Sequence, residues 1–270
     1  KITQILSECR KLTGQNEFST GLQLLQKGKR TIHVTTGASA LDEILGGGVE
    51  SGSITEFYGE FRTGKTQLMH TMCVTSQLGL EQGGGMGKVL YIDTEGNFRP
   101  QRIQQIADRF GLEASETLDN IYVKRCYTHE EQIGAAMMAQ AILAEDGSFR
   151  TVIVDSVISL FRSEFLGRGQ LSERQQLLSS HMRQLVMIAE EFNVAVLIVN
   201  QVTANPDGMS MFGPQVKPVG GNILAHASTT RVMLKKGRGD QRIAVIQDSP
   251  SMPEADATFR ISGGGICNPE

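Results

Sequence analysis

Residues 59–66, Gly-Glu-Phe-Arg-Thr-Gly-Lys-Thr, carry glycines, a lysine and a threonine at the spacing GxxxxGK[ST]. Glycines at these positions let successive backbone N–H groups and the start of a helix face an anion. The lysine then reaches the β- and γ-phosphates of a nucleoside triphosphate, and the threonine hydroxyl binds its Mg²⁺. A Gly-rich turn could match by chance, but a predicted strand precedes this segment and a predicted helix follows it. We therefore predict a nucleotide site formed by Gly59, Glu60, Phe61, Arg62, Thr63, Gly64, Lys65 and Thr66.

Two carboxylates follow apolar runs in other parts of the chain. Asp155 ends the run 151–155, and we predict that it is the metal-side acid that P-loop nucleoside triphosphatases require beside Thr66. Glu95 follows the run 89–92, at the end of a predicted strand where ligands of parallel sheets bind, so it is a candidate general base for the attacking water. Taken alone, Asp155 could be a helix cap or turn residue and Glu95 a solvated loop residue.

Short apolar runs alternate with longer amphipathic stretches, which is typical of an α/β fold with a mostly parallel sheet flanked by helices. The predicted strands are 54–58, 89–92, 121–123, 152–154 and 194–199, and the predicted helices lie near 65–78, 99–110, 129–145 and 172–192. Beyond residue 228, runs at 231–234, 243–246 and 258–261 with Gly-rich turns predict an antiparallel edge. Residues 83–87 and 205–221 fit neither pattern, and we predict that the second is a long functional loop.

The composition limits the class of protein. The 270 residues are 40% hydrophobic and 20% charged, which suits one main core, residues 31–270, behind a short helical linker, residues 1–30. No apolar run approaches the ~18 residues of a membrane-spanning helix, so we expect no membrane contact. A net charge of -3 means that nucleic acid would have to bind at local basic patches.

The cysteines and the first residue bear on the origin of the chain. The four cysteines, Cys9, Cys73, Cys126 and Cys267, form no CxxC pair, which argues against a zinc site and for a reducing intracellular compartment. Because the chain begins at Lys1 with no leader, we interpret it as a fragment or a trimmed chain.

The chain carries a set of short blocks: 59–67, Asp93-Thr94-Glu95-Gly96, Phe98-Arg99-Pro100, Gly167-Arg168-Gly169, Asn200-Gln201, Gly220-Gly221-Asn222, 226–231 and Lys236-Gly237-Arg238-Gly239. Together these blocks resemble the RecA-type strand-exchange recombinases of eukaryotes and archaea. The likeness covers nearly the whole chain and implies a RecA-like ATPase core that forms helical filaments on single-stranded DNA and exchanges strands with a homologous duplex. It also implies ATP and Mg²⁺ as cofactors, single- and double-stranded DNA and mediator proteins as partners, and a nuclear location. Asn205-Pro206 and the Gly-rich end are similar to the meiosis-specific eukaryotic branch.

The resemblance implies further roles around the nucleotide. It extends the phosphate loop to Gln67, makes Gln201 the γ-phosphate sensor that links ATP to the following DNA loop, and packs Arg102 on adenine. It makes His226 the sensor of a neighbouring subunit's γ-phosphate, and the segment from Asp248 to Pro253 a cap on that neighbour's nucleotide. Without the resemblance, these would be interpreted as a solvated arginine, a core histidine and an ordinary turn.

The resemblance also implies two DNA loops. Arg162, Arg168 and Arg174 recur every six residues around a Gly-Arg-Gly turn and could follow a phosphate backbone, although such a pattern alone more often faces solvent. The second loop follows Gln201, and its candidate DNA contacts are Val202, Pro206, Met209, Phe212 and Lys217. Here the chain departs from the family pattern, because the usual paired lysines before Pro218 are Val216 and Lys217 and the loop is about one residue shorter.

Oligomerisation is the remaining implication. Phe18, Thr20 and Gly21 occupy the linker position at which the family inserts a phenylalanine into the next subunit by adding an edge strand. The family's small helical DNA-binding domain is absent from these residues. Two alternatives remain: an accessory paralogue that binds ATP and DNA without exchanging strands, and a RecA-fold motor or signalling ATPase that forms rings.

Overall fold

A computed structural model of the chain describes residues 18–28, 31–165, 167–210 and 213–269. For residues 27, 28, 168, 204–210 and 213–216 it describes the backbone but not the side chains. The chain divides into two compact units, Lys1–Thr31 and Ile32–Glu270. The first unit contains helix α2 (Gly21–Gly28). Thr20 caps this helix, because Gln23 N donates to Thr20 Oγ1 at 3.2 Å and Thr20 N donates to Gln23 Oε1 at 2.8 Å.

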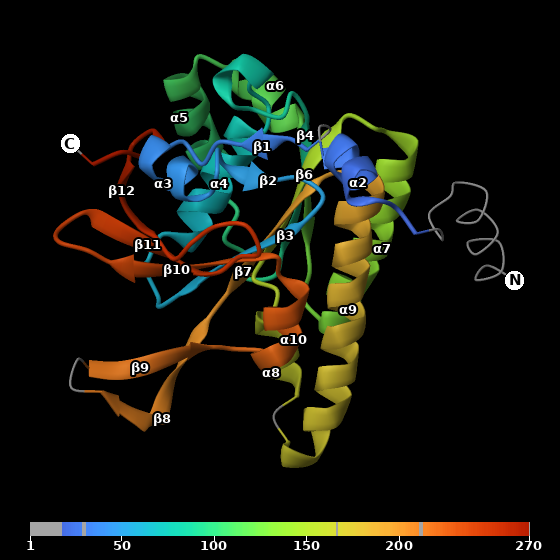
Figure 1. The fold of residues 1–270 in the computed structure, drawn as a ribbon, viewed down its shortest axis with the longest axis vertical. Helices are drawn as coiled ribbons and strands as arrows, with labels where there is room; N and C mark the ends of the chain where they lie inside the picture. Colours follow the sequence, from blue (N-terminus) through green and yellow to red (C-terminus); the bar gives the residue numbers. More distant parts are fainter. Residues whose placement is uncertain (1–17, 29–30, 166, 211–212, 270) are drawn as a thin grey trace, which may run out of the picture. The chain divides into compact units, whose positions relative to one another are not determined.

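The second unit is built on a nine-stranded sheet, counted over the described residues, with the order β13-β12-β11-β10-β3-β7-β6-β4-β5 (Figure 1). Six neighbouring strands are parallel: β10 (Thr230–Lys236), β3 (Ile54–Gly59), β7 (Ala195–Asn200), β6 (Phe149–Asp155), β4 (Lys88–Asp93) and β5 (Ile121–Arg125). Strands β11 (Gln241–Asp248), β12 (Asp256–Ser262) and β13 (Gly265–Cys267) continue it in antiparallel order. The predicted α/β fold, with its antiparallel C-terminal edge, is confirmed.

Helices cover both faces of the sheet, which is why the central strands β4, β6 and β7 are mostly apolar. One apolar core joins Tyr91, Ile153 and Leu197 to α3 (Ser39–Ile44), α4 (Lys65–Thr75) and α5 (Pro100–Phe110), with α6 (Ala114–Asp119) at its edge. The alternate residues Leu90 and Val152 join a second core with α7 (His129–Glu145), α8 (Ser159–Glu164), α9 (Leu171–Phe192) and α10 (Gly221–Ala227). The four long predicted helices are therefore confirmed within a few residues at their ends.

The structure corrects the prediction of a structureless loop at 205–221. Most of this segment lies in a hairpin of β8 (Val202–Ser210) and β9 (Gly213–Pro218), and α10 begins at Gly221. The register pairs Ala204 with Val216 and Met209 with Pro214 but is shifted between them, so Pro206 lies where the ladder is irregular. Proline has no N–H to donate, and such an interruption is where a strand tolerates it.

Shorter elements complete the second unit. They are the strands β1 (His33–Val34) and β2 (Val49–Glu50), which pair with each other, and the 3-10 turns η1 (Leu80–Gln82) and η2 (Arg168–Gln170). Residues 83–87 form a turn and loop, as predicted. Over the ranges the structure covers, no helix is both long and apolar enough to cross a membrane. Cys73, Cys126 and Cys267 are free thiols, and Cys9 lies outside the described residues.

Candidate functional site

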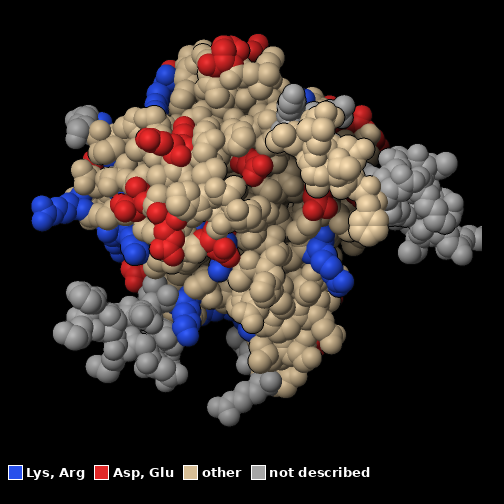
Figure 2. Space-filling view, viewed as in Figure 1, with Lys and Arg blue, Asp and Glu red and all other residues tan. Residues whose placement is uncertain are grey.

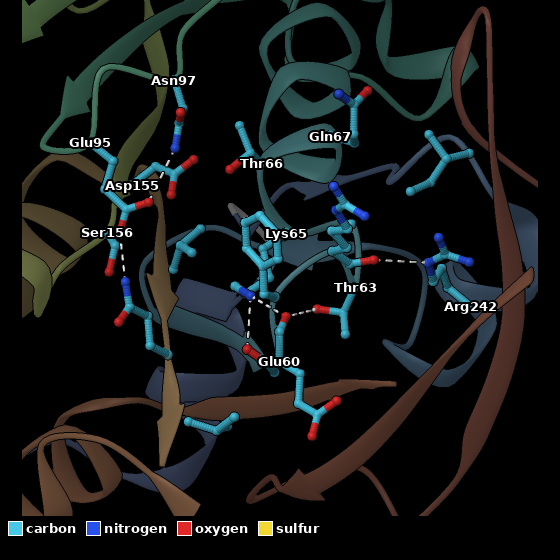
Figure 3. A pocket seen from close by; sticks show the side chains of 18 residues that line it. Glu60, Thr63, Lys65, Thr66, Gln67, Glu95, Asn97, Asp155, Ser156 and Arg242 are labelled. Carbon is cyan, nitrogen blue, oxygen red and sulfur yellow. Dashed lines mark hydrogen bonds between the residues drawn. The ribbon is translucent and has the colours of Figure 1, made fainter. Parts of the chain in front are cut away.

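A cavity of about 620 Å³ opens at the carboxyl ends of the parallel strands. Figure 3 shows the side chains that line it. They come from residues 59–67, from the ends of β4, β6 and β7, and from the antiparallel edge: Glu95, Asn97, Asp155, Ser156, Val199, Gln201, Val202, Arg242 and Ile261. The structure thus brings the phosphate loop, both predicted carboxylates and Gln201 into one site, although they are up to about 140 residues apart in the chain.

Two glycines set the shape of the phosphate loop. A Cβ on Gly59 would lie 2.2 Å from the backbone oxygen of Leu234 on β10, so only glycine fits where β3 ends. Gly64 has a φ of 99°, in the left-handed region, and immediately precedes the first residue of α4. The first N–H groups of α4 have no partner within the helix, so they form an anion site at the floor of the cavity.

Lys65 begins α4 and points back across the loop. Its Nζ donates to the backbone oxygens of Gly59 at 2.8 Å and Glu60 at 2.7 Å, which leaves one N–H for a phosphate. Burial lowers the pKa of Lys65, and the nearby carboxylates Asp155 and Glu95 act in the opposite direction. A fixed ammonium suits the β- and γ-phosphates, and the predicted phosphate contact of Lys65 stays a prediction.

Asp155 ends β6 and is buried. Its Oδ2 accepts a hydrogen bond from the Tyr91 hydroxyl at 2.9 Å, whereas its Oδ1 has no regular hydrogen-bond partner among the described residues. Burial raises the pKa of Asp155 to about 6, against the lowering effect of the hydroxyls of Thr66 and Tyr91. A buried carboxylate oxygen without a hydrogen-bond partner is a candidate ligand atom for a bound cation. Oxygens from Asp155 and Thr66 together suit a hard divalent cation. The described side chains contain no cluster of three or more His, Cys, Asp or Glu residues that could hold a metal ion.

Glu95 stands on a loop that Asp93 holds in place. The two oxygens of Asp93 accept hydrogen bonds from the backbone N–H groups of the next turn, at 2.7–3.2 Å: Glu95, Gly96, Asn97 and Phe98. Both oxygens of Glu95 are then hydrogen bonded, Oε1 by Gln201 Nε2 at 2.7 Å and Oε2 by Asn97 Nδ2 at 3.1 Å. Sequence reasoning missed Asn97, although its place two residues after the candidate base was a usable signal.

Gln201 connects this carboxylate to the segments predicted to bind DNA. Its Oε1 accepts a hydrogen bond from Arg162 Nη1 at 3.3 Å, near the end of α8. Its backbone oxygen accepts one from Val219 N at 2.9 Å, just after β9. One side chain therefore touches the general-base candidate and a predicted DNA-binding arginine, and it stands at the root of hairpin β8–β9.

Other predicted site residues lie outside the cavity lining. Arg102 Nε donates to Gln67 Oε1 at 2.8 Å, so Arg102 contacts a residue that lines the cavity. His226 lies on α10, and Asp248 and Pro253 lie at and after the end of β11. The predicted contacts of His226, Asp248 and Pro253 are with another subunit and stay predictions, as does the predicted packing of Arg102 on adenine.

The predicted DNA-binding residues are described in part. Arg162 and Lys217 are exposed, and Arg174 on α9 is half-buried. Val202 and Lys217 lie on opposite strands of the hairpin, near its root. The side chains of Arg168, Pro206 and Met209 and all of Phe212 lie outside what the structure describes. In the view of Figure 2, several basic side chains lie on the lower half of the molecule.

The fold and the site define a RecA-like P-loop ATPase core. A sequence model of the Rad51 family matches residues 27–269, and the chain belongs to this family. The chain is 53% identical over 266 residues to the meiotic recombination protein DMC1 homolog B of Oryza sativa subsp. japonica, covering 98% of this chain and 77% of the relative. It is 52% identical over 270 residues to the DNA repair protein RAD51 of Mycosarcoma maydis, covering 100% and 79%. With the meiotic recombination protein DMC1 homolog of Lilium longiflorum it shares 51% over 268 residues, covering 99% and 76%.

Proposed function

We propose that this chain is a DNA-dependent ATPase that forms helical filaments on single-stranded DNA and catalyses homologous pairing and strand exchange in recombinational repair. The observation that carries the proposal is that Lys65, Asp155, Glu95 and Gln201 line the same cavity, at the root of hairpin β8–β9. A RecA-fold protein that hydrolyses ATP under the control of DNA needs this connection between the two sites.

The nucleotide chemistry follows from the positions of these groups. The loop and the α4 N-terminus bind the phosphates, Lys65 contacts the terminal ones, and Thr66 and Asp155 would hold Mg²⁺, which neutralises charge on the phosphates. Glu95 orients the attacking water and accepts its proton at a carboxylate oxygen. Gln201 competes with the attacking water for the same carboxylate through its 2.7 Å hydrogen bond. A movement of Gln201 therefore changes how readily Glu95 can accept a proton from that water.

DNA binding is assigned to two neighbouring segments. Arg162, Arg168 and Arg174 supply cations for a phosphate backbone, and hairpin β8–β9 supplies an extended surface beside them. Arg162 donates to Gln201. A phosphate that draws Arg162 away would therefore release Gln201, and this links DNA binding to hydrolysis. Local basic groups suffice for this purpose although the net charge is -3.

Filament formation is supported by the exposed apolar groups at two places. Phe18 is fully exposed beside the helix cap Thr20, so it is available to another copy. Strand β5 is the last strand of the nine-stranded sheet, and Tyr122 and Val123 on it are exposed. Among the described strands β5 pairs on one side only. Such an edge with exposed apolar side chains suits the addition of a strand from a neighbour, which the linker around Phe18 would supply.

The biological setting is proposed from the relatives. Those named above include meiotic recombination proteins and a DNA repair protein at nearly equal identity, 53% and 52%. We assign the chain to the meiotic branch on Asn205-Pro206 and the Gly-rich end. We place it in the nucleus, where chromosomal DNA lies, and expect mediator proteins to load it.

The test is nucleotide-dependent binding to a fluorescent single-stranded oligonucleotide, measured by anisotropy. Lys65→Ala should abolish the ATP-dependent part of binding, because it removes the cation that contacts the terminal phosphates. Lys88→Ala is the matched control, since Lys88 pairs with Asp146 at 2.8 Å and does not line the cavity. Normal ATP-driven filaments from Lys65→Ala would refute the assignment.

A further inference from the structure

Arg242 lies beside the phosphate loop because the β10–β11 hairpin is longer than the strand next to it. The pairing of β3 with β10 ends at Gly59 and Leu234. The pairing of β10 with β11 continues for two more residues, to Lys236 and Arg242. The overhanging part of the hairpin therefore runs along the loop that follows Gly59, and Arg242 lines the cavity.

The contacts of Arg242 hold its side chain without neutralising its charge. Nε donates to the backbone oxygen of Arg62 at 3.2 Å, and Nη1 donates to those of Gln241 at 2.7 Å and Gly239 at 3.4 Å. All three acceptors are uncharged carbonyls. No described carboxylate forms an ion pair with Arg242. A half-buried guanidinium that is already fixed binds an anion at a low cost in side-chain entropy.

The place of Arg242 in the cavity indicates which part of a nucleotide it meets. In Figure 3, Arg242 and Glu95 lie on opposite sides of the phosphate loop. Glu95, Asp155 and Lys65 serve the terminal phosphate, so the opposite side receives the sugar end. Ile261 also lines the cavity and packs against Gly64, where an added Cβ would lie 2.9 Å from Ile261 Cδ1. An apolar surface next to an unpaired cation suits a sugar and its first phosphate.

We infer that Arg242 binds the α-phosphate of the nucleotide, as a second cation opposite Lys65. This inference rests on the proposed ATP site. Lys65 donates two of its three N–H groups to backbone oxygens of the phosphate loop. A second cation therefore complements a triphosphate that carries several negative charges. The guanidinium can bind the α-phosphate through a charge-assisted hydrogen bond while its Nε stays on Arg62.

The test compares the binding of ATP and ADP to the wild type and to Arg242→Ala, Arg242→Gln and Arg238→Ala by isothermal titration in the presence of Mg²⁺. Arg242→Ala and Arg242→Gln should both weaken ATP and ADP about tenfold, which is the effect of one partly exposed charge-assisted hydrogen bond. The loss should shrink as salt is raised, because salt screens charges in a partly exposed site. Arg238→Ala, on the same turn but outside the cavity lining, should bind like the wild type.

The glutamine variant separates this role from a structural one. A glutamine amide can still donate to the Arg62 oxygen but carries no charge. If Arg242→Gln bound ATP like the wild type, Arg242 would be only a clamp on the loop, and the inference would be wrong. Weakened ATP with unchanged ADP would place the contact at the γ-phosphate and also overturn it. If the wild type itself bound neither nucleotide, the proposed function would fail instead.

Discussion

A buried ion pair holds together three strands that carry the site. Glu56 on β3 is 0% exposed; its Oε2 accepts a hydrogen bond from Arg231 Nε on β10 at 2.6 Å, and its Oε1 accepts one from Asn200 Nδ2 on β7 at 2.7 Å. The same Asn200 amide donates to the Val219 oxygen at 2.7 Å, directly after hairpin β8–β9. This network therefore fixes the strands on both sides of β3 and the point at which the hairpin leaves the sheet.

Arg231→Met should lower the free energy of unfolding by about 3–5 kcal/mol, because it leaves the Glu56 carboxylate buried with a single neutral donor. The larger part of this loss comes from the unpaired charge rather than from the missing contact. The double variant Arg231→Met/Glu56→Gln removes the charge as well, so it should recover at least about 2 kcal/mol of the loss.

The assay is urea unfolding followed by circular dichroism at equal protein concentration and without nucleotide, which would otherwise add its own stabilisation. Arg238→Met is the control, because Arg238 is exposed at the β10–β11 turn, and it should change stability by less than about 0.5 kcal/mol. The reasoning would be refuted if Arg231→Met cost less than about 1 kcal/mol, or if the double variant were no more stable than the single one.

Three further predictions concern pH, coupling and DNA. Burial lowers the pKa of His181 from 6.5 to about 4, so the unfolded chain binds the proton first as the pH falls. The free energy of unfolding should therefore fall by about 3 kcal/mol between pH 6.5 and 4. Urea titrations of His181→Gln should lose this part of the pH dependence, and an unchanged dependence would contradict the prediction. Gln201→Ala should keep ATP binding but lose most of the stimulation of phosphate release by single-stranded DNA, and full stimulation would rule out the hydrogen-bonded route through Glu95. Arg168→Ala should spare ATP binding, weaken single-stranded DNA binding and reduce its log–log salt slope by about 1, so titrations that match the wild type at several salt concentrations would disprove the assignment.

The elements that the sequence predicts best are those with strong local patterns. Strands β4, β6 and β7 are buried on both faces, so most of their length appears as an apolar run. The phosphate loop has a fixed spacing because backbone geometry requires it. Hairpin β8–β9 was not predicted, because its three prolines and two glycines are typical of loops and strand pairing depends on a partner segment. The two-residue strands β1 and β2 are too short to show any periodicity.

The meeting of Lys65, Thr66 and Asp155 in one cavity was predictable because the motif spacing and the strand ends indicate it, and their chemical roles stay predictions. Arg242 could not be found in this way, because it reaches Arg62 from 180 positions away in the chain and only the sheet order brings the two together. The role of Asp93 has the same origin, since its four hydrogen bonds to the following turn appear only in the folded loop.

The central claim is that ATP binding in this cavity enables DNA strand exchange. The most direct test is exchange between labelled single-stranded DNA and a homologous duplex, with a heterologous duplex as control, using the full-length protein with and without ATP. The account predicts ATP-dependent exchange with the homologous duplex only. Binding of ATP and DNA without exchange would contradict it and would indicate an accessory paralogue.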